Sequence, residues 1–372
     1  MLATAQPDLA TLLELMPKPP KLPAPSGRVA HVRTTAELVA AVEALQDDTT
    51  ILLADGVYTP PPNLTISKAR VSFRGESGDR EKVSIDAQGG RVNMLCLAGT
   101  KDCLIADVTF RNSELYGVRI YGDTGVTNTR IINVKFHNIW TRGLKGTHPL
   151  RVLDSGSDIA PDSDLERRRP RGGLVQHCLF LCDTPKPWPG YHEPDYISGI
   201  DMMGLKDWTF SDNLFTGIRG QNGGGRGAIF IWVMSEDVIA ERNLIVNCDR
   251  GISFGNPSGS FPQVTRGIVR HNRILGGCNK AIEQCGTLDN EVHHNSIYAT
   301  DYEYPRSVVF SDGCQGGQFH HNLLHGKLEV TPDSSAKLEQ NRSGSLEECF
   351  EAPQRGDLRL TAQAGTEWGA RW

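Results

Sequence analysis

The chain has 372 residues, with 39 Lys and Arg against 44 Asp and Glu, which gives a formal net charge of -5. This negative balance excludes the globally basic surface typical of nucleic-acid-binding proteins, so no nucleic-acid partner is expected. No apolar run reaches the roughly 20 residues that a membrane-spanning helix requires, so no membrane partner is expected either.

Residues 1–33 are predicted to form an N-terminal extension that is rich in proline and carries one short helix candidate, over residues 7–16. This region shows no basic start followed by a long apolar core, so no intact signal peptide is predicted in it. A second helix is expected over residues 34–45, where Thr35 resembles an N-cap and apolar residues follow at helical spacing. An apolar strand over residues 50–58 comes next, and the helix should cap the open end of the domain against pairing with another chain.

Beyond this entry, a short segment recurs with the pattern apolar–x–apolar–x–His/Arg/Asp–Asn, followed by a second apolar pair. Self-similarity at a period of 20–50 residues is typical of solenoids and propellers. Each unit is strand-like and no helical stretch alternates with it, so the sequence predicts an all-β chain. The expected architecture is a single-stranded parallel β-helix over residues 34–340, followed by an irregular tail over residues 341–372. The Asn positions that mark the coils are Asn112, Asn138, Asn213, Asn243, Asn272, Asn295 and Asn322, with Cys178 in the place of Asn in one coil.

Each coil should contain three short strands, and the third begins near a small residue, as in the segments GVRI, GLK, GIDM and GISF. Side chains alternate between the two faces of a strand, so Leu144 and Ile200 should point inward and the residue after each should point outward. Equivalent positions in successive coils lie about 4.8 Å apart and form columns on the surface. The outward column is predicted to contain Arg119, Lys145, Asp201, Ile229, Ser253, Glu283 and Val309.

Two insertions, residues 149–172 and 183–198, interrupt the regular spacing on either side of a strand pair at 174–182. Lys145 and Asp201 should therefore occupy neighbouring coils, although 56 residues separate them. Long loops on a rigid scaffold commonly carry function. Three groups of candidates lie near these loops. His148 ends the Lys145 strand, and Arg219 and Arg226 flank a glycine-rich segment. The second insertion contains Trp188, Tyr191, His192, Glu193 and Asp195.

Two other columns have structural interpretations. The Asn side chains should form a hydrogen-bonded ladder at a corner of each coil. The His column beside it has one ring per coil, and rings about 4.8 Å apart should not converge on one metal ion. Its members, predicted to face solvent or stack, are His137, His177, His271, His294 and His321.

The basic column leaves two interpretations open. Carboxylates such as Asp249 and Glu283 could neutralise it, or it could line a groove for a polyanion, which a local basic stripe on a net negative chain favours. Its members are Arg142, Arg226, Arg250, Lys280 and Arg306.

These residue types suit cleavage of a uronate polymer by β-elimination, in which a base removes the C5 proton and charge builds on the adjacent carboxylate. Lys145 is the predicted base, because burial and cationic neighbours lower the pKa of a lysine. Arg142 and Arg226 are predicted to bind carboxylates, and His148 is a further catalytic candidate. Asp201 is predicted either to orient Lys145 or, with Glu193 and Asp195, to hold Ca²⁺. The substrate-binding candidates are Arg119, Arg219, Arg226, Arg250, His192, Trp188, Tyr191 and Glu283.

The entry segment TILLADGVY, the strands GVRI, GLKG, GIDM and GISF, and the Asn ladder resemble the pectate-lyase-like superfamily of right-handed parallel β-helices. The resemblance spans residues 34–322 and is specific for fold, since that superfamily also contains hydrolases, epimerases and phage tailspikes. The entry and the turn RGESGD at residues 74–79 look most like lyases acting on alginate and dermatan. Those enzymes use a Lys base, an Arg and Ca²⁺, and the resemblance implies that Lys145 is the base.

The sequence thus predicts a secreted or periplasmic, monomeric polysaccharide lyase that acts on an acidic glycan, with Ca²⁺ as the candidate cofactor. Two alternatives stay open. One is a glycoside hydrolase on the same scaffold that uses Asp201 with Asp195 or Glu283, which requires two carboxyl groups about 5–9 Å apart. The other is a non-catalytic solenoid that binds glycans.

Overall fold

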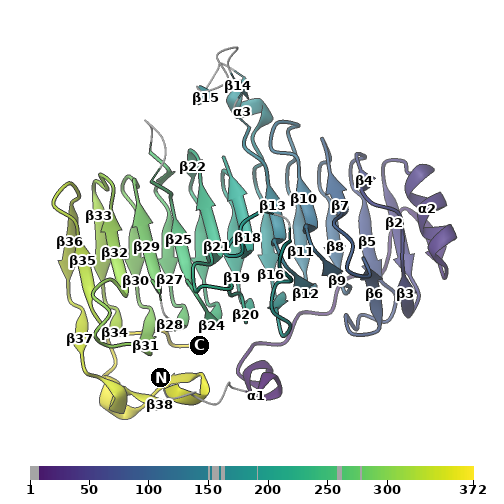
Figure 1. Cartoon of the computed structure of the whole chain (residues 1–372). Coiled ribbons are helices and arrows are strands. Elements are labelled where there is room, and N and C mark those ends of the chain that lie inside the picture. The colour runs from purple at the N-terminus through teal and green to yellow at the C-terminus, as the bar shows by residue number, and fades with distance from the viewer. Residues whose placement is uncertain are drawn as a thin grey trace.

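The computed structural model describes residues 8–372 except 150, 153–158, 161–163, 191, 258–261 and 277–278. It confirms an all-β parallel β-helix, in which each coil adds one strand to each of three long parallel sheets (Figure 1). No helix among the described residues is long and apolar enough to cross a membrane.

The three sheets are called A, B and C here. Sheet A contains β1 (Arg28–Val32), β2 (Thr49–Leu53), β5 (Ser72–Gly75), β8 (Leu104–Ala106), β11 (Arg130–Ile132), β16 (Leu174–Gln176), β19 (Thr209–Ser211), β23 (Ile239–Glu241), β27 (Ile268–Arg270), β30 (Glu291–His293), β33 (Gly317–His320) and β36 (Ala336–Glu339). Sheet B contains β3 (Gly56–Tyr58), β6 (Val83–Asp86), β9 (Thr109–Ser113), β12 (Lys135–Ile139), β17 (Leu179–Leu181), β20 (Leu214–Thr216), β24 (Leu244–Cys248), β28 (Arg273–Gly276), β31 (Ser296–Ala299), β34 (Leu323–His325) and β37 (Arg342–Gly344). Sheet C contains β4 (Leu64–Ile66), β7 (Asn93–Leu97), β10 (Tyr116–Ile120), β13 (Arg142–Gly146), β18 (Ser198–Met203), β21 (Gly227–Trp232), β25 (Ile252–Phe254), β29 (Ile282–Cys285), β32 (Val308–Ser311) and β35 (Leu328–Val330).

The predicted capping helix is α2 (Thr35–Glu43), which lies at the N-terminal end of the coils (Figure 1). Its N-cap is Thr34 rather than Thr35, and Thr34 and Glu37 form a reciprocal capping box. The helix buries Leu38 in the core. The first strand already begins at Arg28, so the coil structure starts before residue 34, inside the predicted extension.

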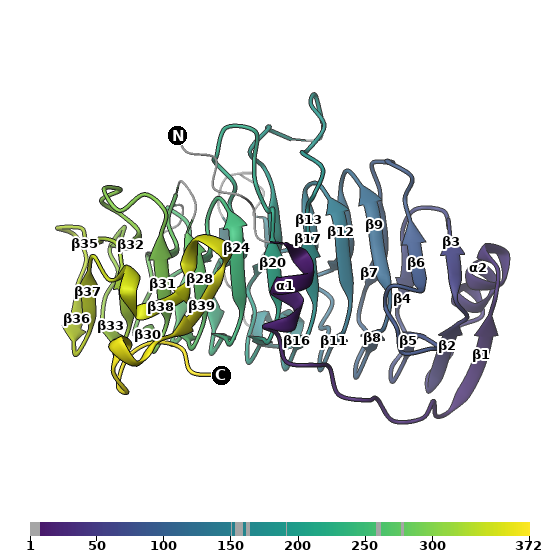
Figure 2. The same ribbon diagram turned by 90° about the horizontal axis from the view of Figure 1, so that it is seen from below.

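Both terminal segments pack on the outer face of sheet B (Figure 2). The N-terminal helix α1 (Leu9–Glu14) inserts Leu12, which is fully buried, and the C-terminal segment adds Phe350 and Leu358 from the small hairpin of β38 (Phe350–Ala352) and β39 (Asp357–Leu360). Sheet B needs this cover because its outward positions are also apolar, and an apolar sheet face must be buried. These outward residues include Leu179, Leu214, Leu244, Val246, Leu275 and Leu323.

The interior of the coils is filled by columns of equivalent side chains. Phe110, Phe136, Phe180 and Phe215 from successive coils stack with ring centroids 5.8, 4.7 and 4.5 Å apart. Such columns favour one register between coils, because a slip by one residue would turn every inward side chain outward.

The Asn ladder is present, but its members differ from those predicted. Nδ2 of each rung donates to Oδ1 of the next at 2.9–3.1 Å, and the ladder extends one coil further than predicted, to Asn341. Asn112 and Asn138 do not belong to it, because they lie at the far end of their sheet B strands and bond Asp86 and Asp183 instead. The six rungs are Asn213, Asn243, Asn272, Asn295, Asn322 and Asn341.

One strand of sheet C is out of the predicted register. Gly227 has a φ of +143°, a conformation that favours glycine, and pairs with Ser198 rather than with Gly199. Ile229 therefore points into the core opposite Ile200, and Phe230 takes the outward position that the sequence analysis assigned to Ile229.

We expect an interior rung of the Asn ladder to contribute more to the free energy of unfolding than the terminal rung does. Asn272→Ala removes a buried amide that donates to the Ala240 carbonyl, and it leaves the Asn243 backbone N–H without its acceptor, which should destabilise the fold by about 2–4 kcal/mol. Asn341→Ala, at the half-buried end of the ladder, should lose about 1 kcal/mol. Urea unfolding followed by circular dichroism measures both, and equal losses would contradict a cooperative ladder.

Candidate functional site on the outer face of sheet C

The strand register brings Lys145 and Asp201 together as the sequence predicts. Arg119 of β10 pairs with Lys145 of β13, and Lys145 pairs with Asp201 of β18. Lys145 Nζ lies 3.0 Å from Asp201 Oδ1. The next residues in this outward column are Phe230, Ser253 and Glu283.

Asp201 is fully buried and accepts three hydrogen bonds. Arg142 Nε donates to Oδ2 at 2.6 Å, and Lys145 Nζ and the indole Nε1 of Trp232 approach Oδ1 at 3.0 Å each. Burial alone would raise the pKa of Asp201, but the charges of Lys145 and Arg142 outweigh it and lower this pKa to about 2. The carboxylate is therefore ionised at neutral pH and holds both cations in place.

Lys145 is almost fully buried, with a relative accessibility of 5%. Burial lowers the pKa of its ammonium group below the ordinary 10.5, and the Arg142 and Arg119 cations act in the same direction against the opposing charge of Asp201. A lysine with a lowered pKa can supply a neutral amine, which is the form that removes protons.

Arg142 is inaccessible to solvent, although the sequence analysis assigned it to substrate carboxylates. Its guanidinium stacks on the ring of Tyr196 at 3.8 Å, and Nη1 donates to the carbonyl of Thr141 at 2.8 Å. Arg142 thus has no surface for a substrate where it lies, and its contact with Asp201 makes it a positioning residue.

The second insertion folds over the N-terminal edge of this part of sheet C. Lys186 is buried and donates from Nζ to the carbonyls of Glu193 and Tyr196 at 2.9 and 3.1 Å. Burial, and next the charge of Arg142, lower the pKa of Lys186 to about 8. Trp188 is half exposed, whereas Tyr191 lies outside the described residues.

His192 is exposed on this insertion and its ring lies 4.3 Å from that of Tyr196. Partial burial lowers the pKa of His192, and the charges of Arg142, Lys186 and Lys145 lower it further. Several cations thus act on one exposed ring, so the electrostatic environment here is positive.

The glycine-rich loop between Arg219 and Arg226 is held by two carboxylates. Asp249 is fully buried, accepts from the backbone N–H groups of Gly220 and Gly225 at 2.7 and 2.9 Å, and pairs with Arg219 Nε at 3.2 Å. Asp195 accepts from the Asn222 backbone N–H at 2.7 Å. A Cβ on Gly220 would lie 2.3 Å from Asp195 Oδ1, so glycine permits this close approach.

Arg226 is the candidate cation of this loop with a free head group. Its backbone N–H donates to the Ile197 carbonyl. Because the register of this strand is shifted, Gly227 rather than Arg226 occupies the position equivalent to Arg142. Its half-buried guanidinium has no hydrogen-bond or ion-pair partner in the part of the chain that the structure describes.

The remaining basic column is largely neutralised. Glu283 bonds Arg250 at 2.9 Å and also bonds Lys280, and Arg306 pairs with Glu329 at 2.8 Å. These contacts support the neutralised interpretation over a polyanion groove along the whole column. The uncompensated positive charge is confined to the coils around Lys145.

The first insertion leaves the opposite edge of sheet C and projects from the coils near α3 (Leu165–Arg168) (Figure 1). His148, at its start, is half-buried. Arg169 belongs to the arginine-rich stretch at residues 167–171 of this insertion. It is fully buried and pairs with Glu166 and Glu236 at 2.7 and 2.8 Å, so it anchors the insertion rather than facing a ligand.

The three acids predicted to hold Ca²⁺ do not form a ligand set. Both oxygens of Asp201 are already bonded to cations, and Asp195 is bonded to the glycine-rich loop. Among the described residues, the group that brings three candidate ligand atoms within 4.8 Å of one another consists of histidines, none of them in this site. Calcium requires several converging oxygen ligands, so these residues do not fit the ion and no step is derived through it.

Tyr196, Lys186 and Trp232 also belong to this site but were not among the residues predicted from the sequence. Trp232 ends the strand that follows Asp201, so the column rule could have placed it near the site. No local pattern shows that Tyr196 covers Arg142 or that Lys186 fastens the insertion, because both contacts depend on how an irregular loop folds back.

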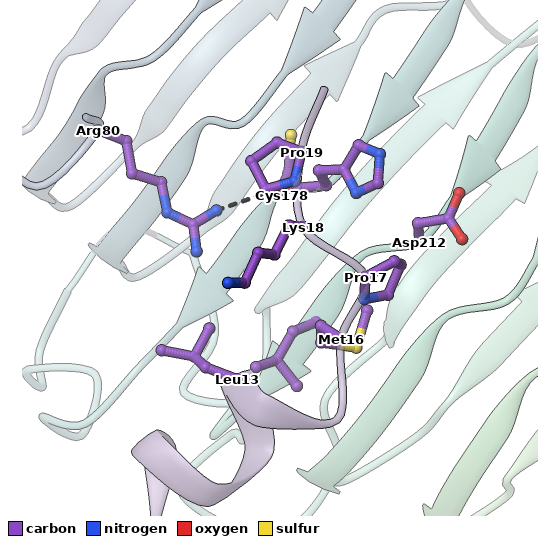
Figure 3. A pocket seen from close by; sticks show the side chains of 10 residues that line it. Leu13, Met16, Pro17, Lys18, Pro19, Arg80, Cys178 and Asp212 are labelled. Carbon is purple, nitrogen blue, oxygen red and sulfur yellow. Dashed lines mark hydrogen bonds between the residues drawn. The ribbon is translucent and has the colours of Figure 1, made fainter. Parts of the chain in front are cut away.

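A pocket of about 100 Å³ lies elsewhere, under the N-terminal segment at the corner between sheets A and B (Figure 3). Met16, Pro17 and Pro19 form one wall of this pocket, and His177 and Asp212 lie on the other. It contains none of the candidate residues. It is a packing gap beneath the segment that leads from α1 to β1.

No family model and no curated protein matches this sequence. A rhamnogalacturonan lyase structure is 11% identical and matches over 92% of this chain and 99% of its own, with a TM-score of 0.50. The fold is a right-handed parallel β-helix. An alginate lyase from Paenibacillus sp. str. FPU-7 is 10% identical over 85% of this chain and 99% of its own (TM-score 0.45), and the Streptococcus pneumoniae surface adhesin PfbA is 11% identical over 84% and 86% (TM-score 0.48). At these identities the likeness shows fold alone.

Removing the central carboxylate should destabilise the protein strongly. Asp201→Asn leaves two buried cations without their anion, and we expect a loss of about 3–5 kcal/mol in the free energy of unfolding. The folded pKa of about 2 lies below the ordinary 3.8, so this contribution is present above pH 3.8 and is lost as the pH falls through 2.

The matched control is Asp183→Asn, which removes a half-exposed carboxylate paired with His137 at 2.8 Å and should lose less than about 1 kcal/mol. Denaturant unfolding at pH 7 measures both variants. An Asp201→Asn loss as small as that of the control would contradict the central role of this carboxylate.

Proposed function

We propose that the outer face of sheet C around Lys145 binds a uronate-containing polysaccharide and cleaves it by β-elimination. The observation that carries the proposal is a buried lysine with a lowered pKa, placed beside Arg119 and Asp201 between two inserted loops. The β-helix fold also occurs in a rhamnogalacturonan lyase, which supports a carbohydrate-active protein in general terms.

The chemistry follows from the residues. The neutral amine of Lys145 takes the C5 proton of a uronate, and the electron pair forms the C4–C5 double bond. The C4–O bond breaks, and its oxygen takes a proton from the Lys145 ammonium group, which returns the lysine to its neutral form. Charge that builds on the uronate carboxylate during this step needs nearby cations. Arg119 and Arg226 supply them, since Arg226 has no acidic partner in the described chain and Arg119 stacks on Tyr121 with a buried Nε that makes no hydrogen bond.

Asp201 sets the condition for this mechanism. While Lys145 bonds Asp201, the protonated form of the lysine is favoured, whereas burial and the neighbouring arginines favour the neutral form. Proton transfer from C5 therefore depends on the fraction of Lys145 that is neutral. A polysaccharide substrate also implies a secreted or periplasmic location, which we propose on that ground.

The hydrolase alternative is less consistent with the geometry. Asp201 and Glu283 are three strands apart in sheet C, about 14 Å at 4.8 Å per strand, which exceeds the span of two hydrolytic carboxyl groups. Asp201, with a pKa of about 2, is also a poor general acid.

A non-catalytic glycan-binding solenoid is the second candidate. It is favoured by one observation, the 5% accessibility of Lys145, which leaves the amine little room to meet a substrate.

The discriminating experiment is incubation with alginate, pectate, chondroitin and dermatan, with and without Ca²⁺, while the absorbance of the unsaturated product is followed. A signal on one polymer supports the lyase. Reducing ends without unsaturated product would select a hydrolase, and binding without any turnover would select the glycan-binding solenoid.

Lys145→Ala should lower the turnover of the active polymer by about 10²–10⁴-fold, the usual contribution of a general base. Lys135→Ala is the control, since Lys135 lies on sheet B and pairs with Glu81 at 2.6 Å, and it should leave turnover unchanged. Initial rates measured by absorbance test both. Full turnover in folded Lys145→Ala would rule out this lysine as the base.

The rate should rise with pH through the pKa of Lys145. Because burial lowers that pKa below 10.5, the neutral amine appears at a lower pH than for an exposed lysine, and the midpoint of the rise in kcat/KM should lie below 10.5. A profile of kcat/KM against pH measures the midpoint. A rate that is flat or falls over this range contradicts a lysine base.

A further inference from the structure

Histidines gather at the corner between sheets A and B in the C-terminal half of the coils. His271 follows β27, His293 ends β30 and His294 follows it. Each of the three offers one ring nitrogen, and these atoms lie within 4.8 Å of one another. This corner is separate from the site on sheet C, because Lys145 and its neighbours lie on another sheet.

His293 and His294, which belong to one coil, face each other through their Nδ1 atoms. His293 Nδ1 and His294 Nδ1 are 2.8 Å apart, which in neutral imidazoles is a hydrogen bond with one shared proton. Two nitrogens at this separation can both reach one ion at the usual metal–nitrogen distance of about 2.0–2.1 Å. His271 from the preceding coil supplies the third nitrogen.

The Asn ladder explains why the rings align. His271 and His294 precede the rungs Asn272 and Asn295, and their φ values are 54° and 52°. A residue held in the left-handed conformation at the same point of each coil places its side chain at the same point of each coil. The expected stacking within the column is present, since the rings of His294 and His321 stack with centroids 4.9 Å apart. The expected count of one ring per coil is wrong, because His293 adds a second ring to one coil.

One carboxylate and the Trp372 side chain lie beside the three rings. Glu291 Oε1 lies 3.9 Å from His293 Nε2 and 2.7 Å from His320 Nε2. Glu291 therefore hydrogen-bonds His320, which is not one of the three rings, and is too far from His293 for a hydrogen bond. Its negative charge nevertheless lies beside the cluster, where it favours a bound cation. The C-terminal Trp372 donates its indole N–H to the His271 carbonyl, so the end of the chain lies against the cluster.

We propose that His271, His293 and His294 bind one divalent transition-metal ion of the Ni²⁺, Cu²⁺ and Zn²⁺ group. Imidazole nitrogens select these ions, whereas Ca²⁺ and Mg²⁺ prefer oxygen. The ligands come from two neighbouring coils, so the ion would fasten one coil to the next. An ion that binds the folded chain also stabilises it by mass action.

The test uses the full chain without an affinity tag, stripped with a chelator and titrated calorimetrically at pH 7.5, where an ordinary imidazole is largely neutral. We expect Zn²⁺, Ni²⁺ and Cu²⁺ to bind with a stoichiometry of one and to raise the Tm, and Ca²⁺ and Mg²⁺ to do neither. The double variant His293→Gln, His294→Gln should bind at least about tenfold more weakly, since even supporting residues contribute 10–100-fold to metal affinity.

The control is His31→Gln, at the opposite end of the coils, where His31 is half exposed and lies 3.7 Å from Glu76. It should bind as the unaltered chain does. Unchanged affinity in the double variant, or a loss only in the variant His320→Gln, His321→Gln, would overturn the proposal.

A second measurement does not depend on the folding of any variant. Electron paramagnetic resonance of the unaltered chain with one equivalent of Cu²⁺ should show couplings to imidazole nitrogen. A spectrum with oxygen ligands alone would overturn the assignment.

Discussion

The register between coils is the constraint on which the rest of the structure depends. Stacked amides from Asn213 to Asn341 bond each coil to the next, and the phenylalanine column fixes which residues of each strand point inward. Because strands in a sheet lie about 4.8 Å apart, a fixed register turns positions distant in sequence into neighbours. Lys145 and Asp201 meet for this reason, and so do the histidines that precede successive Asn rungs.

Stacking one residue per coil also stacks like charges, which must be compensated. Along sheet C, Glu283 and Glu329 neutralise Arg250, Lys280 and Arg306. Around Lys145 the single buried carboxylate of Asp201 faces two cations, and Lys186 adds a third nearby. The two insertions lie at the coils where positive charge exceeds negative charge. The positively charged stretch of sheet C is therefore the stretch that the inserted loops flank.

Burial gives the residues of this site different roles. Arg142 is closed off beneath Tyr196 and holds Asp201, whereas Arg226 keeps its guanidinium without an acidic partner in the described chain. The same aspartate that stabilises Lys145 in its buried position also favours its protonated state. A site of this kind balances stability against reactivity, since the charge that holds the base in place also opposes its use.

From the sequence alone, the repeat determined the parallel β-helix and the pairing of Lys145 with Asp201, and the helical spacing of apolar residues over 34–45 determined the capping helix. These features are predictable because the alternation of side chains along a strand and the spacing along a helix are local properties. The sequence could not show that Gly227 shifts its strand by one residue and exchanges Ile229 for Phe230, since that depends on a backbone conformation that other residues rarely adopt. Nor could it show that Tyr196 buries Arg142, that the acids predicted to bind calcium stay apart, or that His293 joins His271 and His294. These outcomes were decided by tertiary structure, because each depends on where a loop or a neighbouring coil places a side chain, and residue spacing along one chain does not contain that information.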